Sequence, residues 1–167
     1  FYSYPSQLVC NYLPRINIQR LFINLMGFEN TIYALHDWPD ETRALIEAIN
    51  QADDQFYEAV KASPIEIVNF GDNVDGNMLA VPHFQEFVQP YYRQRAAELR
   101  AAGKHCHPHW DGAIKTLLPF CRDCGFDGFE ALTPEPQGDV TIEQIKDALG
   151  DDLILVDGIP CTHFLPQ

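Results

Sequence analysis

Three histidines and an aspartate alternate along one short segment of the chain, residues 104–112. They are His105, His107, His109 and Asp111, each separated from the next by one residue. Because successive side chains of an extended chain point to opposite faces, these four share one face if the segment is a strand. Gly103 is typical of the helix end that would precede such a strand. We therefore predict a strand whose polar carboxyl end lies at the edge where parallel sheets bind ligands.

Imidazole and carboxylate groups at this strand end suit either proton transfer or metal binding. They are ligands for Zn²⁺ and for other divalent first-row metals, so we predict a metal set of His107, His109 and Asp111. His109 and Asp111, nearest the strand end, are also the predicted catalytic pair. The alternative is that the histidines are hydrogen-bonded interior or rim groups without a metal. His105 lies too close to the preceding helix end to join the set.

Polar residues also follow the other predicted strands. The run Ile65–Phe70 is rich in β-branched residues, and Asp72 follows it most closely, so we predict a catalytic carboxylate there. A solvated turn is the alternative for this loop, because Gly, Asn and Asp favour turns. The other polar residues at the strand ends are predicted to bind substrate: Asn73, Asp75, Glu130 and Asp157. Together these groups predict one rim suited to general acid–base catalysis or to a metal.

The elements that must position this rim alternate between helix and strand. Strands are predicted over 65–70, 104–111, 126–132 and 153–156, and helices over 37–62, 82–102, 113–124 and 141–149. This order predicts an α/β fold of parallel (β/α) units, a partial TIM barrel of about four strands in a single domain over residues 1–167. A small open α/β sheet is the alternative. The aromatic opening segment, residues 1–14, is interpreted as a strand end running into a loop, and the chain as a fragment.

Composition excludes several classes of partner. The net charge of −13 argues against nucleic acid and against an anionic membrane surface, both of which need a basic footprint. No apolar run approaches the ~20 residues of a membrane span. The five cysteines do not form a regular disulfide framework, so we expect a reducing, cytoplasmic setting. For Cys121 and Cys124, packing is favoured over a redox or zinc site.

Six segments, in order along the chain, resemble one known family. They are Leu25–Asn30, Phe70–Asn73, Phe84–Tyr92, Gly103–Gly112, Gly125–Gly128 and Gly158–Cys161. With them the chain resembles the uroporphyrinogen decarboxylase superfamily, which includes the corrinoid (cobalamin) methyltransferases. The resemblance implies a (β/α)₈ barrel about twice as long as this chain. It implies that the chain holds the end of the third strand through the seventh, with the remaining strands outside it.

The resemblance implies two chemistries. One is a decarboxylase-type lyase of porphyrin biosynthesis acting on a tetrapyrrole-related substrate, in which the residue at Asp72 helps to hold the macrocycle. The other is metal-assisted methyl transfer from a corrinoid. In that branch the family carries His-x-Cys, whereas this chain has His109 and Asp111, so a carboxylate replaces the thiolate. A third interpretation is a non-catalytic interaction module, whose exposed sheet edges pair with a second copy in a homodimer or with the missing barrel half.

Overall fold

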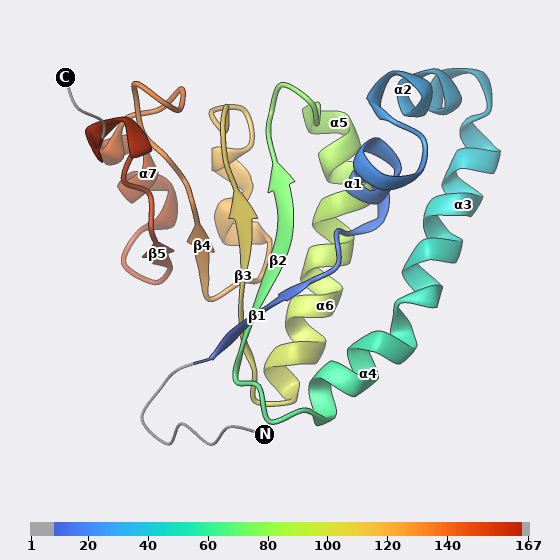
Figure 1. Cartoon of the computed structure of the whole chain (residues 1–167), viewed down its shortest axis with the longest axis horizontal. Helices are drawn as coiled ribbons and strands as arrows, with labels where there is room; N and C mark the ends of the chain where they lie inside the picture. Colours follow the sequence, from blue (N-terminus) through green and yellow to red (C-terminus); the bar gives the residue numbers. More distant parts are fainter. Residues whose placement is uncertain (1–8, 165–167) are drawn as a thin grey trace.

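Five parallel strands form the centre of the structure, a computed structural model that describes residues 9–164 (Figure 1). The strands are β1 (Cys10–Leu13), β2 (Ile67–Val74), β3 (His105–Trp110), β4 (Gly128–Glu130) and β5 (Ile154–Val156). They lie side by side in chain order and the sheet is not closed. This confirms the α/β fold class and the partial barrel, with one strand more than the four predicted. The additional strand is β1, and residues 1–8 of the opening segment lie outside the described residues.

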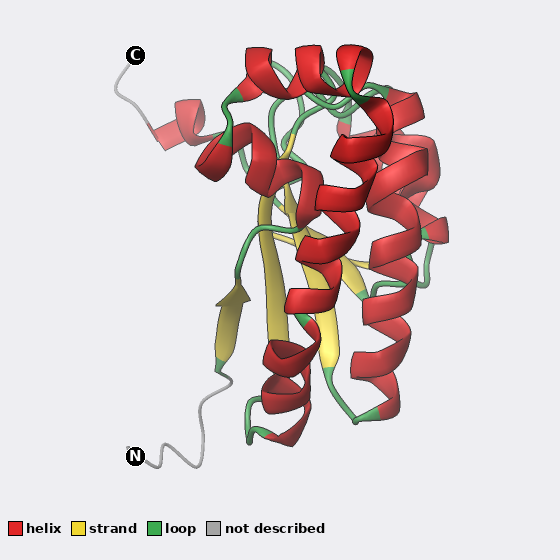
Figure 2. Cartoon of the chain, turned by 90° about the vertical axis from the view of Figure 1, so that its right-hand side faces the viewer, coloured by secondary structure: helices red, strands yellow, loops and turns green. Residues whose placement is uncertain are grey.

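The long helices cover one side of the sheet (Figure 2). We call the other side the open face. The helical elements are α1 (Asn17–Arg20), η1 (Leu21–Leu25), α2 (Phe28–Asp37), α3 (Pro39–Ala52), α4 (Asp54–Ala62), α5 (Val81–His83), η2 (Phe84–Val88), α6 (Gln89–Ala101), η3 (Leu118–Asp123), α7 (Ile142–Leu149) and η4 (Cys161–Phe164). None of the helices within residues 9–164 is both long and apolar enough to cross a membrane.

Aromatic side chains fill the core between the sheet and the helices. The Phe70 ring of β2 packs edge-on against Tyr92 and Phe126, with ring centroids 5.6 and 5.1 Å apart. The Trp110 ring of β3 packs in the same way against Phe84 and Phe129 at 5.5 and 4.9 Å. Because alternate strand residues point to opposite faces, this core fixes which residues of β2 and β3 reach the open face.

Three helices differ from their predictions for local reasons. The helix predicted over 37–62 divides into α3 and α4 around Asp53, whose carboxylate pairs with Arg20 at 3.0 Å. The helix predicted over 113–124 is only the short η3, which begins at Leu118. Pro90 lies in the first turn of α6, directly after the π-helical segment η2, so a proline without an N–H is accommodated there. The helix predicted over 141–149 is α7, which begins with a capping box of Thr141 and Gln144.

Candidate functional site

A row of polar side chains crosses the open face from strand to strand. Tyr12 of β1 lies opposite Asn69 of β2, and Asn69 lies opposite His107 of β3. One step nearer the carboxyl edge, His109 of β3 lies opposite Glu130 of β4. The parallel register therefore gathers five polar residues from four strands, all on the side that a closed barrel would enclose.

Glu130 is the centre of this row. Its carboxylate accepts hydrogen bonds from Asn69 Nδ2 at 2.6 Å, from His109 Nδ1 at 2.7 Å and from the Tyr12 hydroxyl at 3.3 Å. Partial burial pushes the pKa of Glu130 upward. The hydrogen bonds from His109 and Asn69 and the charges of the two histidines outweigh burial, so this pKa lies below its ordinary value. Glu130 is therefore an ionised acceptor at neutral pH.

An ionised Glu130 fixes the tautomer of His109. Because a carboxylate only accepts, His109 must carry a proton on Nδ1, which leaves Nε2 as the second, exchangeable position. Nε2 has no hydrogen-bond partner in the described part of the chain and lies 3.9 Å from Asp111 Oδ2. The His109 side chain is 25% exposed, so the ring is held from one side and open on the other. A nitrogen oriented in this way suits general acid–base catalysis.

His107 is held differently. Asn69 Nδ2 lies 3.2 Å from its Nδ1, and Cys10 Sγ lies 3.7 Å from its Nε2. Because the amide nitrogen donates, His107 Nδ1 accepts and the ring proton sits on Nε2, facing the Cys10 sulfur. Burial is the main cause that lowers the pKa of His107. His107 is therefore a neutral, hydrogen-bonded group that links β1, β2 and β3.

The predicted metal set of His107, His109 and Asp111 does not assemble. Residues two apart on a strand are separated by about 6.6 Å, and His107 turns to Asn69 and Cys10 rather than to the carboxyl edge. Within residues 9–164, no three His, Cys, Asp or Glu side chains are placed to hold a metal ion. Only His109 and Asp111 of the predicted set face each other.

Asp72 lies on the opposite side of the sheet from this row. β2 runs to Val74, and Asp72 shares the helix-covered side with Phe70, because both contact Tyr92 of α6. Its carboxylate is fully buried and accepts from the Ile16 N–H at 2.8 Å and the Tyr92 hydroxyl at 2.6 Å. Burial raises the pKa of Asp72 to about 6, against the opposing effect of these hydrogen bonds. Asp72 thus fixes the start of α1 and does not reach His109 or Asp111.

The predicted substrate-binding residues divide into two groups. Glu130 lies in the polar row, whereas three others shape turns at the carboxyl edge. Asp75 accepts the Asn77 N–H at 2.7 Å, and Asp157 accepts the Gly158 N–H at 2.7 Å. Asn73 has a φ of 52° and an exposed side chain. Their part in substrate binding stays a prediction.

Sequence reasoning missed Tyr12, Asn69 and Cys10. Asn69 alternates with Val68 and Phe70 in a β-branched run, so the period of two could have placed it on the open face. Tyr12 and Cys10 carried no comparable signal, because β1 is only four residues long. Cys10 is one of five free cysteines, and Cys121 and Cys124 are both buried.

A cavity of about 490 Å³ opens on the same face toward the amino ends of the strands. Cys10, Ile67, His105, Gly128 and Val156 are among the residues that line it. In a closed barrel this space receives side chains from the strands that complete the ring. The open face is therefore apolar toward the amino ends of the strands, where the cavity lies, and polar toward their carboxyl ends, where the polar row lies.

Comparison with known proteins bears directly on this sheet and its polar face. The family model for uroporphyrinogen decarboxylase matches residues 20–154, which include β2 to β4 and the first residue of β5. The chain belongs to the uroporphyrinogen decarboxylase family. Among solved structures, this family member resembles a methyltransferase from Methanosarcina mazei, with a TM-score of 0.71 and 15% identity. The match covers 89% of this chain and 42% of that protein, so it shows a shared fold over less than half of the neighbour.

The relatives found among curated protein sequences are cysteine desulfurases. The chain is 34% identical over 112 residues to the cysteine desulfurase IscS of Aeromonas hydrophila subsp. hydrophila, and 30% identical over 112 residues to that of Colwellia psychrerythraea. Each match covers 66% of this uroporphyrinogen decarboxylase family chain but only 25% of the relative. A likeness to a quarter of a protein does not carry that protein's activity.

Proposed function

We propose that this chain contributes part of the active site of a decarboxylase-type lyase that acts on a tetrapyrrole-related substrate. In this proposal His109 is the proton-transfer group and Glu130 orients it. The observation that carries the proposal is the 2.7 Å hydrogen bond between His109 Nδ1 and Glu130 Oε2, with Nε2 directed toward Asp111. The substrate class rests on the family model that matches residues 20–154.

Decarboxylation needs a group of this type. When the bond to the departing carboxylate breaks, CO₂ leaves and the electron pair stays on the substrate carbon, which must then take a proton. An imidazole gains and loses a proton near neutral pH, so it suits this step. Glu130 holds Nδ1–H, and His109 therefore donates from Nε2. The Asp111 carboxylate lies 3.9 Å from Nε2, on the side of the ring from which the proton leaves.

The decisive comparison is between two histidines on the same face of the same strand. His109→Gln removes the proton donor beside Glu130. His105→Gln changes a histidine whose side chain is 72% exposed and has no contact with Glu130. We expect His109→Gln to slow anaerobic CO₂ release from uroporphyrinogen about 10²- to 10⁴-fold, the range for a general acid, and His105→Gln to leave it unchanged. Equal rates for the two variants would refute the role of His109.

The edge strands β1 and β5 each have one side without a partner strand among the described residues. Apolar side chains are exposed at both edges, with Val9 and Tyr12 at β1 and Ile154 at β5 between 56% and 64% exposed. Unpaired strand edges of this kind favour association. We expect the edges to pair with further strands of a larger barrel or with a second copy in a homodimer. A stable, well-folded monomer of this chain in sedimentation velocity would contradict that expectation and the non-catalytic interaction module with it.

A second candidate is metal-assisted, corrinoid-dependent methyl transfer. The specific observation is that His109 Nε2 and Asp111 Oδ2 face each other at 3.9 Å. These two donors fall short of the three or four protein ligands of a zinc site, so the residues present do not fit a complete site and we derive no step through a metal. Calorimetric titration with Zn²⁺ tests this branch, with His109→Ala and Asp111→Ala as variants. No binding above background by the parent chain would exclude it.

A further inference from the structure

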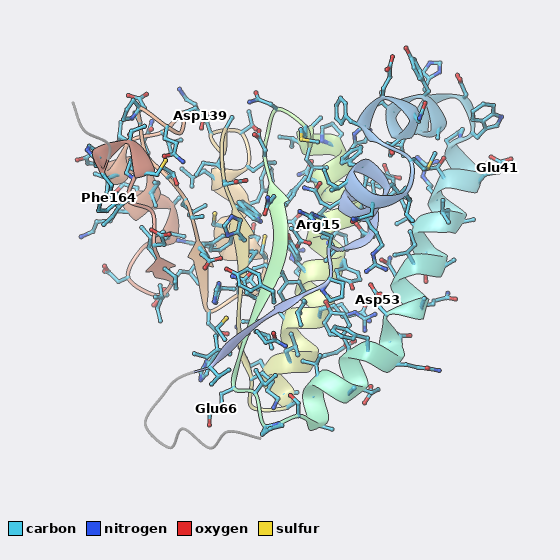
Figure 3. All side chains as sticks on the ribbon, viewed as in Figure 1. Arg15, Glu41, Asp53, Glu66, Asp139 and Phe164 are labelled. Carbon is cyan, nitrogen blue, oxygen red and sulfur yellow. The ribbon has the colours of Figure 1, made fainter. Side chains whose placement is uncertain are left out.

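Arg15 lies where the chain leaves β1 and turns toward α1, at the carboxyl side of the sheet (Figure 3). Hydrogen bonds hold its backbone on both sides. Arg20 Nε donates to the Arg15 carbonyl oxygen at 2.9 Å, and Ile16 donates its N–H to Asp72 at 2.8 Å. The guanidinium therefore extends from a fixed backbone position near the carboxyl ends of the strands, the end of the sheet at which His109 and Asp111 also lie.

The side chain of Arg15 differs from that of every other arginine in the chain. The other six each donate at least one side-chain hydrogen bond to a protein acceptor: Arg20, Arg43, Arg93, Arg95, Arg100 and Arg122. Arg15 donates none to any residue that the structure describes. Its Nε is buried without a partner, although the residue as a whole is partly exposed. A buried N–H of a charged group without an acceptor costs free energy, and such groups call for a functional explanation.

The nearby carboxylate of Asp72 makes no direct ion pair with Arg15. Burial raises the pKa of Asp72 to about 6, and the charge of Arg15 is one of the effects that oppose the rise. The two oxygens of Asp72 already accept from Ile16 and Tyr92, and Arg15 makes no ion pair within the described residues. Arg15 is therefore a cation without a direct ion-pair partner among the described residues, in a chain whose net charge is −13.

We propose that Arg15 binds a carboxylate of the substrate at the carboxyl edge of β1. This inference rests on the proposed function, because it assigns a substrate group to that site. The planar guanidinium presents paired donors that match the two oxygens of a carboxylate. Asp111 and Glu130 repel anions, so an anionic substrate needs a local cation to enter this rim. A single arginine then selects a substrate by the position of one carboxylate and disfavours further negative charge.

The test is a titration of the full ¹⁵N-labelled chain with propionate, followed by NMR at the arginine Nε–Hε groups and at the Ile16 amide. Sodium chloride at matched ionic strength controls for screening, and inorganic phosphate is a second arm. We expect propionate to shift Arg15 and Ile16 saturably. Arg15→Gln should weaken this binding about tenfold or more, since a charged hydrogen-bond partner is lost. Lys115→Gln removes an equal charge from the exposed loop after β3 and should leave binding unchanged.

Arg15→Lys keeps the charge but loses the paired donors, and we expect binding between that of the parent and of Arg15→Gln. The Arg15→Lys variant also tests the proposal if Arg15→Gln does not fold. An equal shift with chloride, or unchanged propionate binding in both Arg15 variants, would overturn the site. A stronger response to phosphate would overturn its assignment to carboxylates. His109→Gln separates this inference from the proposed function. Propionate binding should be unchanged in that variant, and this result tests Arg15 alone. The rate of CO₂ release in the same variant tests His109 alone.

Discussion

Replacing Glu130 with glutamine tests the polar row at its centre. Glu130 accepts from His109, Asn69 and Tyr12, and the bonds from His109 and Asn69 both end on Oε2. A glutamine keeps the shape but turns one acceptor oxygen into a donating NH₂ group. A glutamine can keep both bonds by placing its amide oxygen at this position. A neutral amide oxygen is a weaker acceptor than a carboxylate, so the bond that orients His109 is weakened.

The magnitude follows from the bond between His109 and Glu130. A hydrogen bond to a charged group contributes about 1.5–3 kcal/mol, and about 1.4 kcal/mol corresponds to a tenfold change in rate. If this bond acts mainly when the ring is protonated, Glu130→Gln lowers the rate of CO₂ release about 10- to 100-fold.

The assay is CO₂ release by the parent chain and the variant across the pH range, with unfolding in urea measured alongside. Glu66→Gln is the matched control, because Glu66 is an exposed carboxylate at the opposite end of the sheet (Figure 3). It removes the same charge without touching His109. Parent-like rates for Glu130→Gln, together with a slow His109→Gln variant, would refute the orienting role of Glu130.

Two further predictions concern the side of the sheet that the helices cover. The folded-state pKa of Asp72, about 6, lies above its ordinary value of 3.8, so the folded state binds the proton more tightly and stability falls as pH rises from about 4 to 6. Asp72→Asn should flatten this decline, which amounts to about 3 kcal/mol at most, in urea unfolding at several pH values. Phe70→Ala should lower the free energy of unfolding by about 3–5 kcal/mol, because the cavity it leaves among Tyr92 and Phe126 cannot be refilled. Ile23→Ala, at a site 47% exposed, is the control, and a similar loss for both variants would contradict the packing argument.

The sequence allowed part of this arrangement to be predicted. The alternation of His107 and His109 with apolar residues placed both on one face of β3, and the rhythm of strand and helix placed Glu130 on the same rim. Both follow from local rules, the period of a strand and the pairing of successive parallel units. The family resemblance placed the chain in a partial barrel, and the family model and the fold confirm it.

The parts that could not be predicted depend on how far β2 extends and on the register between strands. The loop after Phe70 looked like a turn, but β2 continues to Val74, which buries Asp72 beside Tyr92. The metal set assumed that neighbouring polar residues on a strand converge, whereas the register offers His107 a closer partner in Asn69. Register in a parallel sheet is set by long-range packing, which a single sequence does not reveal.

The strand order has a consequence for how the chain folds. Each strand pairs only with its neighbours in sequence, from β1 through β5. Each new strand and helix can therefore dock onto a unit that already exists, without waiting for a distant part of the chain. Loop closure is longest between β1 and β2, where α1, η1, α2, α3 and α4 intervene, and shorter for the later units. We expect β2, β3 and α6 to form the first stable nucleus during synthesis, and the polar row to be complete only once β1 and β4 have joined it.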